Sequence, residues 1–366
     1  MYQHDNRIVI TLDAGGTNFV FGAMQANHFI VEPYTLPSNS DDLDRCLATM
    51  VDGFTHIISQ LPKPATAISF AFPGPADYPN GIIGGYLPNF PSFREGVALG
   101  PFLEEKFGLP VFINNDGDLY AYGEALAGIL PEINGKLERM NSSKRYKNLI
   151  GYTFGTGFGV GVVVNGDLNR GDNSCVETFC LEHKNLKGVI VEAGVSVNAI
   201  KRIYGEKSGH FDHTYEPKEI FEIAEGAREG DANAAKTAFS ELGEVAGAAM
   251  CVSATLIDSI IVIGGGITAA RKYIMPALFK TMRSKIATLS GEAVNRVQME
   301  VFDLDNEAEF STFANGSKRE LKVYGSDKSV VYDPMKRIGV AISHLGASQA
   351  ISLGAYSFAL TQIDKQ

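Results

Sequence analysis

The chain of 366 residues contains no tryptophan and only four cysteines. So few cysteines in so long a chain do not make a disulfide framework. The sequence also lacks any run near the roughly 18 apolar residues of a membrane-spanning helix, and its first residues, MYQHDNR, lack the basic start and apolar core of a signal peptide. These absences predict a cytoplasmic protein with reduced thiols and no membrane partner.

Basic residues are also in short supply. Lys and Arg number 32 against 42 Asp and Glu, which gives a formal net charge of −10 and a pI near 5.3. Binding to nucleic acid relies on clustered Lys and Arg that neutralise phosphates, so this balance argues against a nucleic-acid partner. A small phosphorylated ligand is still compatible with it, because a metal ion or backbone N–H groups can offset the local repulsion.

Apolar residues make up 45% of the chain, a typical value for a globular protein of two or three domains. The apolar pattern predicts strands at 8–12 and 19–24, a helix at 41–61, and two further helices between 216 and 258 that are broken near Gly230. A strand, a glycine turn and a second strand recur around residues 155–159. This recurrence predicts an α/β protein built from two related halves.

We expect the first domain at residues 1–120, completed by a small-residue helix at 350–366. A larger α/β domain is expected at 121–349, and its polar stretch at 303–334 is interpreted as a hairpin excursion or insertion.

The segment LDAGGTN places an acid, two glycines and a Thr-Asn pair between two apolar strands. A plain hairpin needs only a short turn, and the segment matches neither the Walker nor the dinucleotide-binding pattern. Glycine lets backbone N–H groups face an anion, Thr17 and Asn18 add side-chain donors, and Asp13 can hold Mg²⁺ through water. The segment is therefore a candidate phosphate loop. A tight turn with a solvated Asp13 is the alternative.

Two further glycine loops have similar chemistry. GTGFG at 155–159 lies between strands, and its alternative reading is a β-bulge or close strand packing. GGG at 264–266 follows an apolar strand and begins a helix, where an anion or a nucleotide can approach the backbone closely. Together the three loops favour a nucleotide ligand.

An acid follows the apolar strand in VFINNDGDLYAYGE. Asp116 comes directly after Asn115, at the start of an expected helix whose dipole stabilises a carboxylate, so it can act as a proton acceptor. Kinase chemistry needs such a base near a hydroxyl and a neutralised phosphoryl group. Helix capping by Asp116 or Asp118 is the alternative, and since both cannot be the cap, one acid is left over.

The motifs LDAGGTN, PGPAD, LPNFPSF, INNDGDLYAYGEALAG, GTGFGVGVVVNG and IVIGGGI resemble, in this order, those of the ROK family of sugar kinases. The resemblance covers most of residues 8–275 and the closing helix. It implies the actin-like fold of sugar kinases and Hsp70, with two ribonuclease H-like α/β domains flanking a central cleft. It also implies a homodimer that uses ATP and Mg²⁺ to phosphorylate a hexose, most simply glucose. Fructose, mannose or an N-acetylhexosamine are the alternative substrates.

The resemblance also implies residue roles. Asp116 corresponds to the catalytic base. The residues that correspond to the ATP and phosphate loops are Asp13, Gly15, Gly16, Thr17, Asn18, Gly155, Thr156, Gly264, Gly265 and Gly266. Those that correspond to the sugar site are Gly74, Asn89, Asn115, Asp116, Glu177 and Glu192.

The sequence departs from the family between residues 169 and 200. The family's Glu-Gly-His element has two candidate counterparts here, Glu177 by its distance from Gly171, or Glu182 with His183. The family's zinc loop is absent, and the spacing of Cys175, Cys180 and His183, even with His210 or His213, matches no standard zinc site. No structural zinc is expected, and we expect the cysteines to be unligated and buried.

Two other classes of protein compete with the kinase. A sugar-responsive transcription regulator of the ROK type carries a DNA-binding segment before the first phosphate loop, whereas about seven residues precede the first expected strand here. A sugar-binding protein without catalysis would not need Asp13, Asp116 and the glycine loops.

Overall fold

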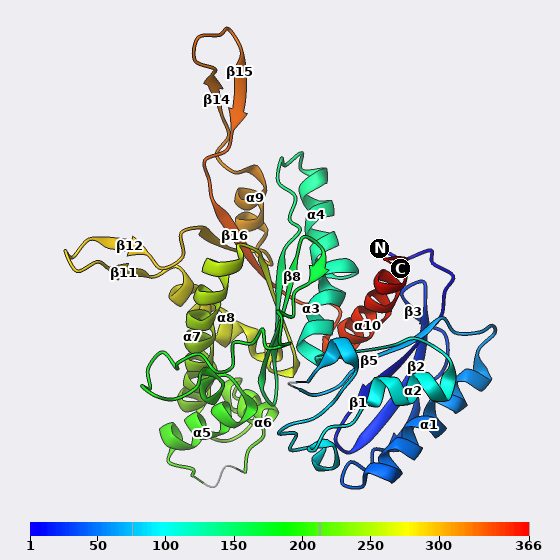
Figure 1. Ribbon diagram of the computed structural model, residues 1–366. Coiled ribbons are helices and arrows are strands. Elements are labelled where there is room, and N and C mark those ends of the chain that lie inside the picture. The colour runs from blue at the N-terminus through cyan, green and yellow to red at the C-terminus, as the bar shows by residue number, and fades with distance from the viewer. Residues whose placement is uncertain (75, 212–213, 366) are drawn as a thin grey trace. The chain divides into compact units, whose positions relative to one another are not determined.

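The computed structural model describes residues 1–74, 76–211 and 214–365 and divides into two compact units. The first unit comprises Met1–Pro131, Val160–Val176 and His344–Gln366, and the second comprises Glu132–Gly159 and Glu177–Ser343. Each unit is an assembly of strands and helices (Figure 1).

The first sheet has the strand order β3-β2-β1-β5-β6, with β4 paired to β2. β1 and β2 form the predicted antiparallel hairpin, whereas β1, β5 and β6 run parallel. The strands of this sheet are β1 (Val9–Ala14), β2 (Asn18–Gln25), β3 (His28–Phe29), β4 (Tyr34–Pro37), β5 (Ala67–Ala71) and β6 (Val111–Asn114).

Helices cover both faces of the first sheet. Alternate residues of β1 divide between the faces, since Ile10 packs with Phe54 of α1 while Val9 packs with Leu353 of α10. The predicted helices at 41–61 and at the end of the chain are confirmed. The helices of this part of the chain are α1 (Leu43–Gln60), η1 (Tyr78–Asn80), η2 (Pro91–Phe93), α2 (Leu99–Phe107), α3 (Asp116–Leu126), α4 (Ile129–Arg139) and α10 (Ala347–Asp364).

The second sheet has the order β13-β16-β10-β7-β8-β9. Its strands β7, β10, β16 and β13 are parallel. Two hairpins, β11–β12 and β14–β15, form separate two-stranded sheets. The strands are β7 (Leu149–Phe154), β8 (Phe158–Val164), β9 (Asp167–Leu168), β10 (Ile260–Gly264), β11 (Lys285–Ala287), β12 (Ala293–Asn295), β13 (Glu300–Asp303), β14 (Arg319–Lys322), β15 (Ser329–Tyr332) and β16 (Arg337–Ile342).

The second unit confirms the predicted helix break near Gly230, because α6 ends at Ala224 and α7 begins at Ala232. Among the described helices, α7 would also suit a membrane span by length and hydropathy, but more than half of that stretch is buried, and α7 packs on α5, α6 and α8. The helices are η3 (Val191–Gly194), α5 (Val197–Ser208), α6 (Pro217–Ala224), α7 (Ala232–Ile257), η4 (Gly266–Ala270), α8 (Arg271–Met282) and α9 (Glu307–Asn315).

The stretch interpreted as a hairpin excursion at 303–334 also contains a helix. Asn306 caps α9 by accepting hydrogen bonds from the backbone N–H groups of Ala308 and Glu309. Phe310 and Phe313 on the same helix are buried. The polar composition of the segment obscured this short helix, although its Asn cap and two apolar residues were visible signals.

Candidate functional site

Polar residues gather at the carboxyl ends of three parallel strands in the first unit. Asp13 of β1 pairs in register with Ala71 of β5, and Ala71 pairs with Asn114 of β6. Asp116 begins α3 directly beyond this row. The carboxyl edge of parallel strands is where α/β proteins bind their ligands, so the topology brings Asp13 and Asp116 to one edge.

The first glycine loop is held in place from several sides. The hydroxyls of Ser38 and Ser40 donate hydrogen bonds to the carbonyl oxygen of Gly16, at 2.5 and 3.0 Å. A Cβ atom on Gly16 would lie 2.8 Å from the Cβ of Asn89, so this loop lies directly against the predicted sugar-site residue Asn89. Thr17 and Asn18 are exposed. Their side chains and the fixed loop can face a ligand together.

The start of α3 corrects one interpretation. Neither Asp116 nor Asp118 is the cap, because Asn115 accepts a hydrogen bond from the backbone N–H of Gly117 at 2.8 Å. Asp116 accepts a second bond from the same N–H, also at 2.8 Å. A Cβ on Gly117 would lie 2.6 Å from the carbonyl oxygen of Val160, so close packing demands glycine here. Neither Asp116 nor Asp118 is used as the helix cap, so both acids, rather than one, are available for another role.

Desolvation and charge both act on the carboxylate of Asp116, although the residue as a whole is exposed. The residue keeps solvent contact at its surface, while the protein atoms around its carboxylate desolvate it and raise the pKa of Asp116. Hydrogen bonds from the backbone N–H groups of Gly117 and Asp116 oppose this rise, and the negative charge of Asp13 adds to it. Desolvation also raises the pKa of Asp13. Asp116 is therefore a stronger base than an ordinary aspartate, and it lies within electrostatic reach of Asp13.

A buried ionic group behind Asp116 was missed by the sequence reasoning. Arg170 donates a hydrogen bond from its NH1 to Oδ1 of Asn114 at 2.8 Å. Asp118 is buried, and desolvation raises the pKa of Asp118 to about 7, with Arg170 lowering it and Asp116 raising it. The only signal was the run of polar residues after an apolar strand, and nothing in the sequence pointed to Arg170.

The second glycine loop lies in the second unit and is tied to Glu192. Oε2 of Glu192 accepts a hydrogen bond from the backbone N–H of Phe158 at 2.9 Å, and a Cβ on Gly157 would lie 2.7 Å from that same oxygen. The carbonyl oxygen of Gly155 accepts from the N–H of Val197, the first residue of α5, at 2.9 Å. No atom lies within 4 Å of a Cβ built on Gly155, so Gly155 has open space beside it.

The third glycine loop packs onto the second. Gly265 has a φ of +93°, and a Cβ there would lie 2.3 Å from the carbonyl oxygen of Phe154 at the end of β7. Gly264 pairs with Thr153 in the parallel ladder. In contrast, a Cβ on Gly266 would meet nothing within 4 Å. The two loops therefore form one glycine-rich edge with an open backbone face at Gly155 and Gly266.

The two candidates for the family's Glu-His element differ in their surroundings. His183 is buried, and its ring lies 2.4 Å from the Cβ position of Gly194, two residues after Glu192. Glu182 accepts from the N–H of Gly188 at 2.9 Å. Glu177 is half-buried in the preceding loop. Glu182 and His183 thus lie on a segment that packs beside residues 190–194, next to Glu192.

The cysteines depart from expectation in part. Cys46 and Cys251 are buried as expected, but Cys175 and Cys180 are exposed, because the loop that carries them runs along the surface. His210 is exposed, and His213 lies outside the described residues. Among the described residues, no three His, Cys, Asp or Glu side chains are gathered as a shared metal ion would require.

Asp13 is suited to an ion that is bound mainly by substrate. It is an exposed carboxylate at the carboxyl edge of the sheet, beside the glycine loop. Mg²⁺ keeps several waters and takes one or two carboxylates together with substrate phosphates, so a single acid beside a phosphate loop fits it.

Comparisons with known proteins agree with this architecture. A glucokinase from Parabacteroides distasonis of known structure is 56% identical, with a TM-score of 0.91 and coverage of 99% of both chains. The glucokinase of Thermotoga maritima is 25% identical over 76% of this chain and 86% of its own. The xylose repressor of Bacillus spizizenii is 28% identical over 43% of this chain, a match that spans only 37% of the repressor.

The fold is therefore the two-domain actin-like α/β class, as predicted. The sequence profile described as the ROK family matches residues 9–308. The chain belongs to the ROK family.

Proposed function

We propose that this protein is an ATP-dependent sugar kinase that phosphorylates a hydroxyl group of a hexose, with glucose as its substrate. One observation carries the proposal: Asp13 and Asp116 lie at the carboxyl edge of one sheet, close enough for the charge of Asp13 to raise the pKa of Asp116. A phosphate-side acid and a proton acceptor are the two groups that phosphoryl transfer requires.

Asp116 is the general base. Its raised pKa brings its basicity closer to neutral pH, where proton transfer is most effective. It accepts the proton of the sugar hydroxyl as that oxygen forms a bond to the terminal phosphorus of ATP. The bond from this phosphorus to the ADP oxygen breaks, and ADP leaves with the electron pair. Asp116 then releases the proton to solvent.

Backbone groups hold the nucleotide. Gly15, Gly16, Thr17 and Asn18 form the phosphate loop of the first unit, and Gly155 with Thr156 forms that of the second. Gly264 to Gly266 face the adenosine. When bound, Mg²⁺ neutralises charge on the phosphates, and Asp13 would hold it through water. The open backbone at Gly155 and Gly266 supports these assignments.

Sugar hydroxyls are bound by Asn89, Asn115 and Asp116, with Gly74 lining the same pocket. Within the second unit, the candidate sugar-binding residues are Glu192 together with Glu177 or with Glu182 and His183. Because Oδ1 of Asn115 is used by the helix cap, its Nδ2 is the donor left for the sugar. A groove of about 690 Å³, bounded by Ala76, Asp77 and residues 172–174, lies beside the Gly74 loop. Its size is within the range of small-molecule sites.

The test is an assay of ADP release from ATP over glucose, fructose, mannose and N-acetylhexosamines. The highest kcat/KM is expected with glucose. Preference for another sugar in this panel corrects the substrate and keeps the reaction. Absence of ADP release with every sugar, alongside sugar binding in calorimetry, would establish the non-catalytic sugar-binding alternative instead.

The similarity to the xylose repressor makes DNA binding a second property to measure, and no binding is expected. We place the enzyme in the cytoplasm as a homodimer.

A further inference from the structure

Two hairpins of the second unit stand apart from its main sheet. We call β11–β12, residues 285–295, the short arm and β14–β15, residues 319–332, the long arm. Neither pairs with the six-stranded sheet, and every residue in their strands is exposed (Figure 1). A lone two-stranded hairpin is at best marginally stable in water. The arms therefore need a further surface for a stable conformation.

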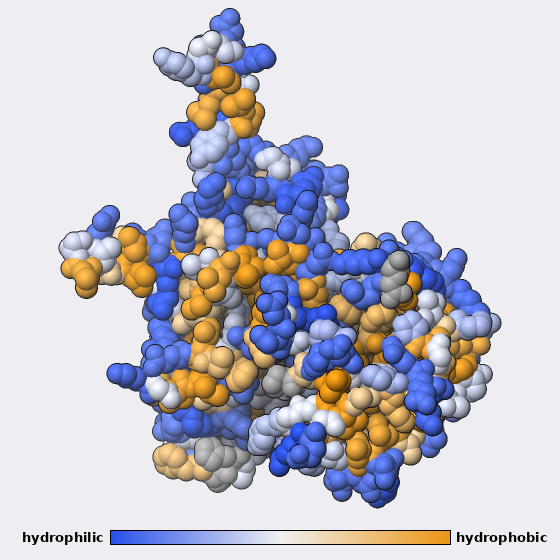
Figure 2. Space-filling model, viewed as in Figure 1, coloured by the Kyte–Doolittle hydropathy of each residue, from blue (hydrophilic) through white to orange (hydrophobic). Residues whose placement is uncertain are grey.

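The arms carry large apolar side chains that are exposed to water. Figure 2 shows hydrophobic residues on both of them. Tyr324 is fully exposed near the tip of the long arm, and Leu289 is fully exposed near the tip of the short arm. The other exposed apolar side chains of the arms are Ile286, Val294, Leu321, Val323, Val330, Val331 and Tyr332. Such a concentration marks a surface that is covered by a partner.

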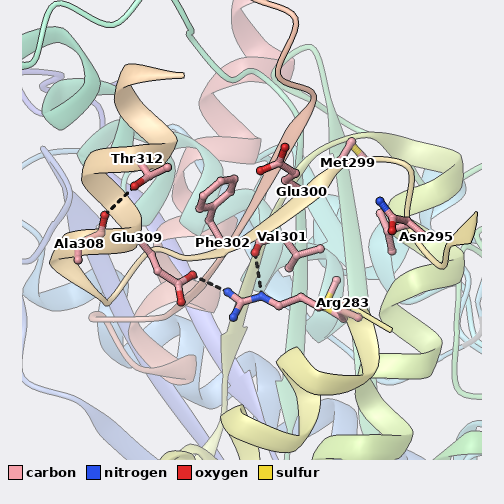
Figure 3. Close-up of a pocket in the computed structure, with 11 residues that line it drawn as sticks. Arg283, Asn295, Met299, Glu300, Val301, Phe302, Ala308, Glu309 and Thr312 are labelled. Atoms are coloured by element: carbon pink, nitrogen blue, oxygen red, sulfur yellow. Dashed lines mark hydrogen bonds and ion pairs between the residues drawn. The ribbon is translucent and has the colours of Figure 1, made fainter. Parts of the chain in front are cut away.

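A groove lies at the base of both arms. Its volume is about 490 Å³, and it extends from Asn295 at the end of β12 to Thr312 on α9, the helix that leads into the long arm (Figure 3). Val301 and Phe302 of β13 provide apolar lining. Along one side, Arg283 bonds the carbonyl oxygen of Val301 and pairs with Glu309 of α9, which fixes that wall of the groove.

The long arm and the segment that borders the groove have opposite net charge. Between residues 319 and 332 the long arm carries three basic residues against two acidic ones: Arg319, Lys322 and Lys328 against Glu320 and Asp327. Between 300 and 309 the segment that borders the groove carries five acids and no base: Glu300, Asp303, Asp305, Glu307 and Glu309. An apolar arm with net positive charge and an apolar groove bordered by this acidic segment are complementary.

A chain cannot place its long arm in its own groove, because the arm extends away from the helix and strand that form the groove (Figure 1). We propose that a second copy of this chain occupies the groove, so that each protomer lays its long arm in the groove of the other. The short arm borders the same contact. In a dimer with a two-fold axis, the same contact forms twice. The six residues from Arg319 to Tyr324 span about 20 Å when extended, which is enough to cross such a groove.

The first experiment is sedimentation velocity of the full chain. The wild type is expected to be a dimer. Two variants are expected to raise the dissociation constant at least about a hundredfold: Tyr324→Ser combined with Val331→Ser on the arm, and Ala308→Trp, which fills the groove from an exposed position of α9. Circular dichroism checks that both fold.

Two matched controls belong to the same unit. Leu256→Ser removes an apolar side chain on α7 that is 76% exposed, and Asn315→Trp adds a tryptophan to an exposed, uncharged position of α9 that does not line the groove. Both are expected to remain dimers. A monomeric wild type, or a dimer that persists in the arm and groove variants, would overturn the proposal. A monomeric wild type would mean that a different partner covers the arms.

Mixing the arm variant with the groove variant separates arm exchange from any other dimer. The arm variant keeps an intact groove, and the groove variant keeps an intact arm, so the mixture retains one of the two contacts. It should associate more tightly than either variant alone. A mixture that is no tighter than its components contradicts the reciprocal arrangement.

Discussion

The two main sheets share one plan and differ in what they carry at their carboxyl edges. The first sheet, with the order β3-β2-β1-β5-β6, has two acids at its carboxyl edge. They are Asp13 in β1 and Asp116 just after β6. In the second, the order β9-β8-β7-β10-β16 places Thr153 where β1 has Asp13, and its neighbouring turns are glycine-rich. The same scaffold thus supports charge in one case and open backbone in the other. Side chains at strand ends can change without disturbing the cores, because those cores lie in the strands themselves.

The largest effect that this contrast predicts falls on the acidic edge. Asp116→Asn keeps the shape of the residue but removes the proton acceptor, so kcat should fall by roughly 10²–10⁴-fold while sugar affinity in calorimetry stays nearly constant. Asp41→Asn, at an exposed acid of the same unit, is the control and should retain full turnover. Wild-type turnover in the Asp116 variant would reject the assignment of the base.

The next effect concerns the pH dependence of stability. The pKa of Asp118 is about 7 in the folded protein, above its unfolded value near 3.8. Its favourable contribution is therefore fully present below about pH 4 and is lost as the pH rises through 7. The variant Asp118→Asn lacks this titration. The difference in unfolding free energy between the variant and the wild type should therefore shift in favour of the variant by up to about 4 kcal/mol between pH 4 and pH 8. Denaturant titrations from pH 4 to 8 measure this, and parallel curves for the two proteins would contradict it.

The glycine edge of the second sheet should respond through its backbone. Gly265→Ala forces a side chain into a φ of +93° and against the carbonyl of Phe154, so it should lower the unfolding free energy by at least about 1–3 kcal/mol. Gly266→Ala is the matched partner, because its Cβ would meet no atom within 4 Å. It should leave stability within about 0.5 kcal/mol and raise the KM for ATP. Equal destabilisation of both variants would show that the open backbone face is absent.

The smallest effect lies at Glu192. Glu192→Gln keeps an oxygen that can accept from the N–H of Phe158 but removes the charge, which weakens that bond by about 1 kcal/mol. The KM for the sugar should rise about fivefold, with a smaller change in kcat. Initial rates over a range of sugar concentrations measure both constants. A fall in kcat as large as that of Asp116→Asn would assign Glu192 to the chemistry instead.

Much of the fold could be predicted because its elements have strong local signals. The helix at 41–61, the break near Gly230 and the β1–β2 hairpin follow from periodicity and glycine. The helix α9 was hidden by polar composition. The capping alternative for α3 considered Asp116 and Asp118 but not Asn115, which is the cap, because all three are good caps and only the backbone geometry distinguishes them.

By itself the sequence determined the glycine turns, the acids next to them and the alternation of strands and helices, since these depend on residues adjacent in the chain. The tertiary structure decided what lies beside each acid. It brought Arg170 to Asn114 across 56 residues, buried Asp118 and placed Gly16 against Asn89. Desolvation and charge pairing depend on neighbours distant in sequence, and no local pattern encodes them.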